Sequence, residues 1–92
     1  MQFIAITRRR IERFSEAEIA EHLGAEGARA KALYAEGVFR SINSRGDTPG
    51  AVIVVEAADP AAARAAVESL PLARLEMMDI EVIPLLPYRG FV

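Results

Sequence analysis

The 92-residue sequence contains no cysteine, no tryptophan and a single histidine, His22. Without cysteine the chain cannot form a disulfide, a thiolate metal site or a cysteine nucleophile. One histidine is also too few for a histidine-based metal cluster. We therefore expect no metal site built from thiolates or from a histidine cluster.

A strong charge imbalance and long apolar runs are missing as well. The formal net charge is −2 at pH 7, which gives no electrostatic reason to expect a nucleic acid or an acidic membrane as partner. No apolar run approaches the roughly 20 residues that span a bilayer. Residues 1–7 are apolar, but their basic neighbours follow them, whereas a signal peptide has its basic residues first. We expect a cytoplasmic protein.

Apolar residues are abundant, at 52% of the chain. This fraction favours a packed globule over disorder. The length fits one domain, residues 1–92. A chain this short buries only about two-thirds of its unfolded surface, so it would gain stability from a partner.

Two helices are predicted from their end signals. The first begins at Ser15, whose spacing to Glu18 is that of a capping box. It ends near Gly37, because glycine adopts a left-handed helix end at little cost. The second begins at Asp59-Pro60, with Asp as N-cap and Pro at the first helical position, and ends at Pro71.

Four apolar segments are predicted to be strands, at residues 3–7, 38–43, 51–55 and 77–83. The basic residues 8–10 that follow the first strand are interpreted as a solvated loop rather than an anion site. The resulting order is strand, helix, strand, strand, helix, strand. This order predicts a ferredoxin-like α+β fold, βαββαβ, with a four-stranded antiparallel sheet.

The third strand, residues 51–55, is apolar on both of its faces. Two helices cover only one face of such a sheet, and the other face would be a large exposed apolar patch. The apolar C-terminal segment, residues 85–92, would also be unusual as a free tail. We therefore predict a homodimer or a higher homo-oligomer, in which a second copy covers the open sheet face.

Glu26 lies on the apolar stripe of the first predicted helix, between Leu23 and Ala30. A carboxylate that faces a core must be paired, protonated, or open to a cavity. The alternative is a helix rotated so that Gly27 faces inward and Glu26 lies at its edge. The sequence leaves both possibilities open.

Arg40 is the second polar residue with apolar neighbours. Strand alternation places it on one face with Val38 and Ile42. An arginine in such a setting usually has a specific anionic partner. The partner would be Glu26 or the carboxylate of a substrate.

Several short motifs, in order along the chain, resemble muconolactone isomerase, a family of the dimeric α+β barrel superfamily. The resemblance is most specific where a Leu-Pro-Leu segment is followed by Met-Asp-Ile-Glu-Val. The matching positions are Glu26, Ala30, Leu33, Glu36-Gly37, Phe39-Arg40, Leu70-Pro71-Leu72 and Met78-Asp79-Ile80-Glu81-Val82.

The resemblance implies proton transfer on a small unsaturated lactone from bacterial aromatic degradation, without cofactor or metal. Glu26 fits the general base and Arg40 the cation that binds the carboxylate of the substrate. We assign substrate binding to Tyr34, Phe39 and Ile42. Two alternatives remain: a non-catalytic α+β barrel that binds a small hydrophobic ligand, and a structural or stress-related oligomer.

Overall fold

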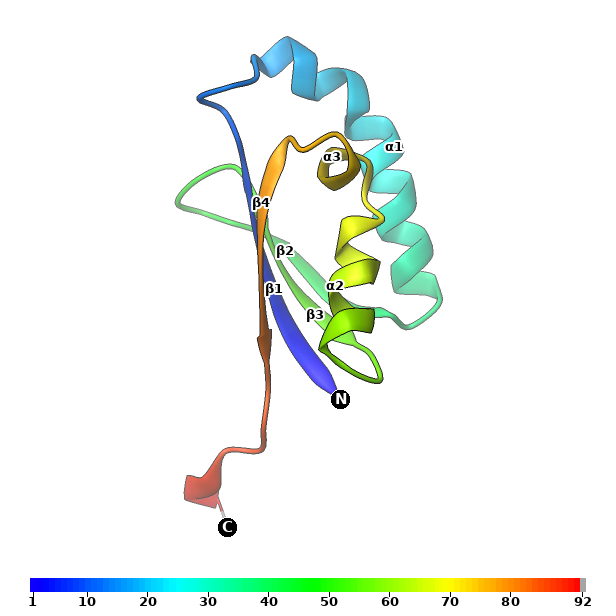
Figure 1. Ribbon diagram of the computed structural model, residues 1–92, viewed down its shortest axis with the longest axis vertical. Helices are drawn as coiled ribbons and strands as arrows, with labels where there is room; N and C mark the ends of the chain where they lie inside the picture. Colours follow the sequence, from blue (N-terminus) through cyan, green and yellow to red (C-terminus); the bar gives the residue numbers. More distant parts are fainter. Residues whose placement is uncertain (92) are drawn as a thin grey trace.

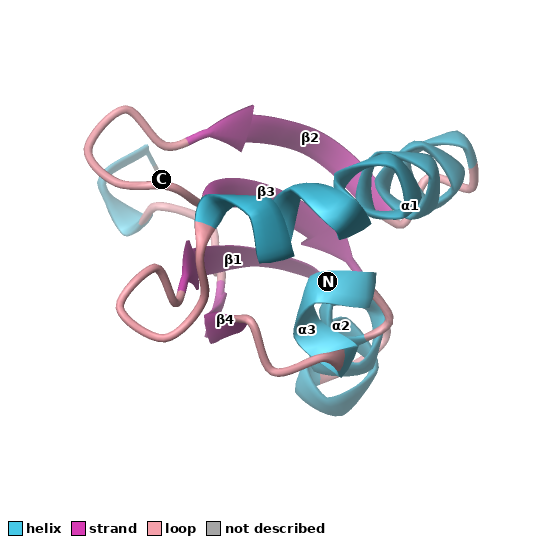
Figure 2. Ribbon diagram, turned by 90° about the horizontal axis from the view of Figure 1, so that it is seen from above, coloured by secondary structure: helices cyan, strands magenta, loops and turns pink. Residues whose placement is uncertain are grey.

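One antiparallel sheet, with the three α-helices on one side, makes up the fold in the computed structural model, which describes residues 1–91 (Figure 1). The strands lie in the order β2-β3-β1-β4. Viewed from above, the three α-helices lie on the same side of the strands (Figure 2). This is the predicted ferredoxin-like α+β fold. The elements are β1 (Gln2–Arg9), α1 (Glu16–Ala35), β2 (Phe39–Ser44), β3 (Ala51–Glu56), α2 (Pro60–Glu68), α3 (Pro71–Arg74), β4 (Met78–Pro84) and the 3-10 turn η1 (Arg89–Phe91).

The ends of α1 follow the local signals of the sequence. The Ser15 side chain accepts a hydrogen bond from the Glu18 N–H, and the Glu18 carboxylate accepts one from the Ser15 N–H. This reciprocal pair is the predicted capping box. Gly37 follows the helix with a φ of 79°, a conformation that glycine adopts without strain. Both predicted ends are confirmed.

The second predicted helix is divided in two. Asp59 caps α2 as predicted, since its side chain accepts a hydrogen bond from the Ala62 N–H. However, α2 ends at Glu68, and Pro71 is the first residue of α3. The prediction that Pro71 ends a helix is wrong, because proline is equally suited to the first helical position, where no N–H is needed.

β1 is longer than predicted and runs through Arg9 instead of ending at Thr7. The flanking arginines, Arg8 and Arg10, bind the carboxylate of Asp79 in β4, at 2.7 and 2.8 Å. Interpreting these basic residues as a solvated loop is therefore wrong. Charge pairing with a neighbouring strand extends the sheet beyond its apolar part.

The main core fills the space between the helices and the sheet. Its buried residues come from β1, β2, β3, α1 and α2, together with Leu70, the N-cap of α3. The core comprises Phe3, Ala5, Leu33, Phe39, Ile53, Val55, Ala63, Val67 and Leu70. No helix in the described part of the chain has both the length and the apolarity that a membrane crossing requires.

On the opposite face of the sheet, residues 1–91 place no α-helix. Its centre is apolar and half-buried, formed by Ile4 and Ile6 of β1 and by Val52 and Val54 of β3. Beyond β4 the chain extends away from the sheet (Figure 1). The side chain of Phe91 in this segment is 89% exposed. The described chain thus leaves one apolar face of the sheet open.

Candidate functional site

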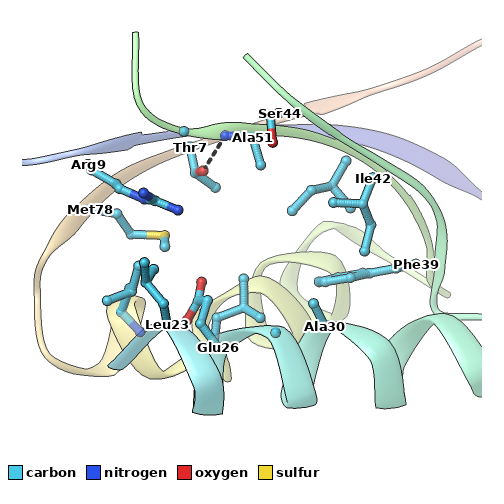
Figure 3. Close-up of a pocket in the computed structure, with 15 residues that line it drawn as sticks. Thr7, Arg9, Leu23, Glu26, Ala30, Phe39, Ile42, Ser44, Ala51 and Met78 are labelled. Carbon is cyan, nitrogen blue, oxygen red and sulfur yellow. Dashed lines mark hydrogen bonds between the residues drawn. The ribbon is translucent and has the colours of Figure 1, made fainter. Parts of the chain in front are cut away.

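A pocket of about 360 Å³ lies between α1 and the helix-facing side of the sheet. This volume is at the small end of the range for ligand sites. In Figure 3, Thr7, Arg9 and Glu26 lie toward one end of the pocket, and Phe39 and Ile42 toward the other. Within residues 1–91, no group of three or more acidic or histidine side chains is arranged to hold a metal ion. The pocket therefore suits a small molecule with one polar and one apolar part.

Glu26 points from α1 into this pocket and is half-buried (Figure 3). Its Oε1 accepts a hydrogen bond from the Leu72 N–H at 2.9 Å. Leu72 is the second residue of α3, whose N-cap, Leu70, has no side-chain acceptor. Pro71 between them has no N–H. Glu26 therefore caps α3 from a different helix.

Burial raises the pKa of Glu26 above the ordinary value of a glutamate. The hydrogen bond from the Leu72 N–H and the positive charge of Arg9 act in the opposite direction but are smaller. A carboxyl group whose pKa is raised in a pocket is a candidate for general acid–base chemistry. Of the possibilities left open by the sequence, the structure supports a carboxylate that opens into a cavity.

The structure does not bring Arg40 together with Glu26. A β-bulge lies between Phe39 and Ser41, so that the alternation of β2 is interrupted. Phe39 and Ile42 consequently line the pocket, whereas Arg40 is exposed and lies outside it. The expectation that Arg40 shares a face with Ile42 is wrong, because Arg40 is itself the extra residue of the bulge and the alternation between the two positions is broken.

Of the three residues assigned to substrate binding, two line the pocket and one does not. Phe39 is 1% exposed and forms part of the pocket wall, and Ile42 also lines the pocket. Tyr34 is 60% exposed and lies outside the pocket. Leu33 takes the buried position at the end of the α1 stripe, so its neighbour Tyr34 points away.

Arg9 is the pocket residue that the sequence reasoning missed. It is the last residue of β1 and follows Thr7 on the helix-facing side of the strand. Unlike Arg8 and Arg10, its guanidinium forms no hydrogen bond or ion pair with any residue of the described chain. The alternation of buried residues along β1, continued by two positions, would have identified it.

Thr7 and Gly50 line the pocket on the side that the sheet forms. The Thr7 hydroxyl oxygen accepts a hydrogen bond from the Ala51 N–H at 3.0 Å (Figure 3). A Cβ atom at Gly50 would overlap the backbone carbonyl oxygen of Thr7. Glycine at this position therefore allows the start of β3 to approach β1 closely.

Comparison with known proteins agrees with the fold. The family model described as muconolactone delta-isomerase matches residues 1–90. No curated protein sequence matches the chain. The family match includes every element that lines the pocket and supports an isomerase-like small α+β protein. The chain belongs to the muconolactone delta-isomerase family.

Proposed function

We propose that this protein is a cofactor-independent isomerase that moves a proton on a small unsaturated lactone or related organic acid from aromatic degradation. The observation that carries the proposal is the carboxyl group of Glu26, which opens into the pocket with a pKa raised by burial. The family match supports the same reaction class.

The proposed reaction is an intramolecular shift of one double bond. The Glu26 carboxylate removes a proton from a carbon activated by the conjugated lactone carbonyl, and the electrons move into a dienolate. The protonated Glu26 then returns the proton to a different carbon of the conjugated system. A raised pKa suits this double role, because the same group must accept and return the proton near neutral pH.

The geometry of Glu26 supports a defined proton-transfer position. Its Oε1 is held by the Leu72 N–H, and this fixes the orientation of the carboxyl group. The other oxygen, Oε2, remains available to a molecule in the pocket. Positioning of this kind contributes to catalysis because it removes the need to orient the base during the reaction.

The test is proton–deuterium exchange on muconolactone and related unsaturated lactones in D₂O, followed by NMR. Wild-type protein is expected to exchange the protons of at least one lactone, and Glu26→Gln to lose this activity. Binding without any exchange by the wild-type protein would refute the isomerase and favour the non-catalytic alternative. Exchange that survives in Glu26→Gln would show that a different group is the base.

The proposal includes a homodimer or higher homo-oligomer formed through the open face of the sheet. Its support is the apolar centre of that face, including Ile6 and Val54, which no helix of the described chain covers. The exposed apolar segment after β4 offers further surface to a second copy. Light scattering tests this part of the proposal, and a stable monomer would refute it.

A further inference from the structure

Among the described residues that line the pocket, Arg9 is the only positively charged one, and Glu26 is the only other ionisable one. The guanidinium of Arg9 points into the pocket, near Met78 and Thr7 (Figure 3). It is partly withdrawn from water, yet it has no anionic partner within residues 1–91. An arginine in this position is suited to an anion, because its planar fork of N–H donors matches a carboxylate.

The neighbours of Arg9 make the same end of the pocket polar. Thr7 is 2% exposed, and its hydroxyl oxygen already accepts the Ala51 N–H. Its O–H proton therefore remains available for an oxygen atom of a ligand. At the other end, Phe39 and Ile42 offer only apolar surface.

We propose that Arg9 is the anion-binding residue of this pocket, and that it holds the carboxylate of a small organic acid whose ring lies against Phe39 and Ile42. Only the reaction in this inference rests on the proposed function: Glu26 would act on the ring of the acid that Arg9 holds. Binding of the acid by Arg9 does not require turnover. Arg9 thereby takes the role that the sequence assigned to Arg40.

The proposal has an electrostatic consequence. In the free protein, the charge of Arg9 lowers the pKa of Glu26 and so counteracts part of the effect of burial. A bound carboxylate neutralises that charge and adds a second anion near Glu26. The pKa of Glu26 therefore rises when the acid binds, and binding is accompanied by proton uptake.

The test is titration calorimetry with two carboxylates, muconolactone and benzoate, each compared with its neutral methyl ester. Wild-type protein is expected to prefer the acid over the ester. Arg9→Gln is expected to weaken acid binding about 10- to 100-fold, the range of a charge-assisted hydrogen bond, and to leave ester binding unchanged. Arg9→Lys keeps the charge and is expected to retain part of the preference.

Two matched variants each remove one positive charge elsewhere. Arg64→Gln, on the exposed side of α2, and Arg40→Gln, outside the pocket, are expected to bind the acids as the wild-type protein does. Proton uptake, measured in buffers of different ionisation enthalpy, is expected for the wild-type protein and is absent in Glu26→Gln. Circular dichroism shows whether each variant is folded.

Several outcomes would overturn the inference. These are equal binding of the acids by wild-type protein and Arg9→Gln, loss of acid binding in Arg40→Gln instead, or no binding of either acid by the wild-type protein. Failure of the proposed function gives a different result. In that case Glu26→Gln still exchanges the lactone protons, or neither the wild-type protein nor any variant exchanges them. Arg9→Gln would nevertheless lose its preference for acids over esters, whereas the wild-type protein would keep it.

Discussion

Glu26 has two roles in this structure, a structural one at the start of α3 and a proposed chemical one in the pocket, and two substitutions separate them. Glu26→Gln removes the charge but keeps an oxygen that accepts the Leu72 N–H. Glu26→Ala removes the acceptor as well. Both variants are uncharged at this position, so the difference between them reports the loss of the cap.

The size of that difference follows from the burial of Leu72, which is 1% exposed. Leaving a buried N–H without an acceptor costs about 1–3 kcal/mol. For a domain of this size, each kcal/mol lowers the melting temperature by roughly 4–8 °C. We expect Glu26→Ala to melt about 10 °C below Glu26→Gln, near the middle of these ranges.

The matched control is the pair Glu21→Gln and Glu21→Ala, at an exposed position of α1. These two variants are expected to differ by less than about 0.5 kcal/mol, as for most surface substitutions. Melting is followed by circular dichroism at a fixed protein concentration. If the Glu26 pair differs no more than the Glu21 pair, Glu26 does not cap α3 and the reasoning is wrong.

The pH dependence of the same melts tests the raised pKa of Glu26. In the folded state Glu26 binds its proton more tightly than in the unfolded state. This contributes stability that is fully present below the ordinary pKa of a glutamate, about 4.3, and is lost as the pH rises through the raised folded value. Glu26→Gln does not titrate, so it should become more stable relative to the wild-type protein as the pH increases. A stability difference that stays constant across this window would contradict a raised pKa.

Other substitutions test the core, the open face, the strand pair and the proposed base. Phe39→Ala should lower the free energy of unfolding by about 3 kcal/mol in urea titrations, the lower end of the range for aromatic core residues, because the new space joins an existing pocket. Val54→Asp should convert the proposed oligomer to monomers in light scattering while the circular dichroism spectrum stays native. Asp79→Asn should lower the melting temperature, and the effect should shrink as the pH falls, because the pKa of Asp79 is lowered by its bonds to Arg10 and Arg8. Glu26→Gln should reduce the rate of lactone proton exchange by about 10²- to 10⁴-fold, the contribution of a general base, in a protein that remains folded.

The features that the sequence predicted correctly depend on residues close together in the chain. Ser15 and Glu18 form their capping box within one helical turn. Gly37 ends α1 through its own backbone conformation. Glu26 was singled out by its place on a helical stripe, which the pocket explains. In each case the physical cause is contained in a short segment.

The features that the sequence did not predict depend on distant partners. The bulge at Phe39–Ser41 arises from the pairing of β2 with β3, which leaves Arg40 outside the pocket. The extension of β1 to Arg9 accompanies ion pairs to Asp79, which lies about seventy positions away. The basic residues 8–10 therefore looked like a loop by composition alone.

The proline at the start of α3 has a consequence for Glu26, the proposed base. Position 71 is the only point in the first turn of this helix where the backbone offers no N–H donor. A different residue there would bring a second donor next to the one that Glu26 already binds. That donor would compete for Oε2, the oxygen that the proposed proton transfer uses. The Leu-Pro-Leu segment is thus more than a helix start: its proline adds no N–H donor that would occupy the second oxygen of the Glu26 carboxylate.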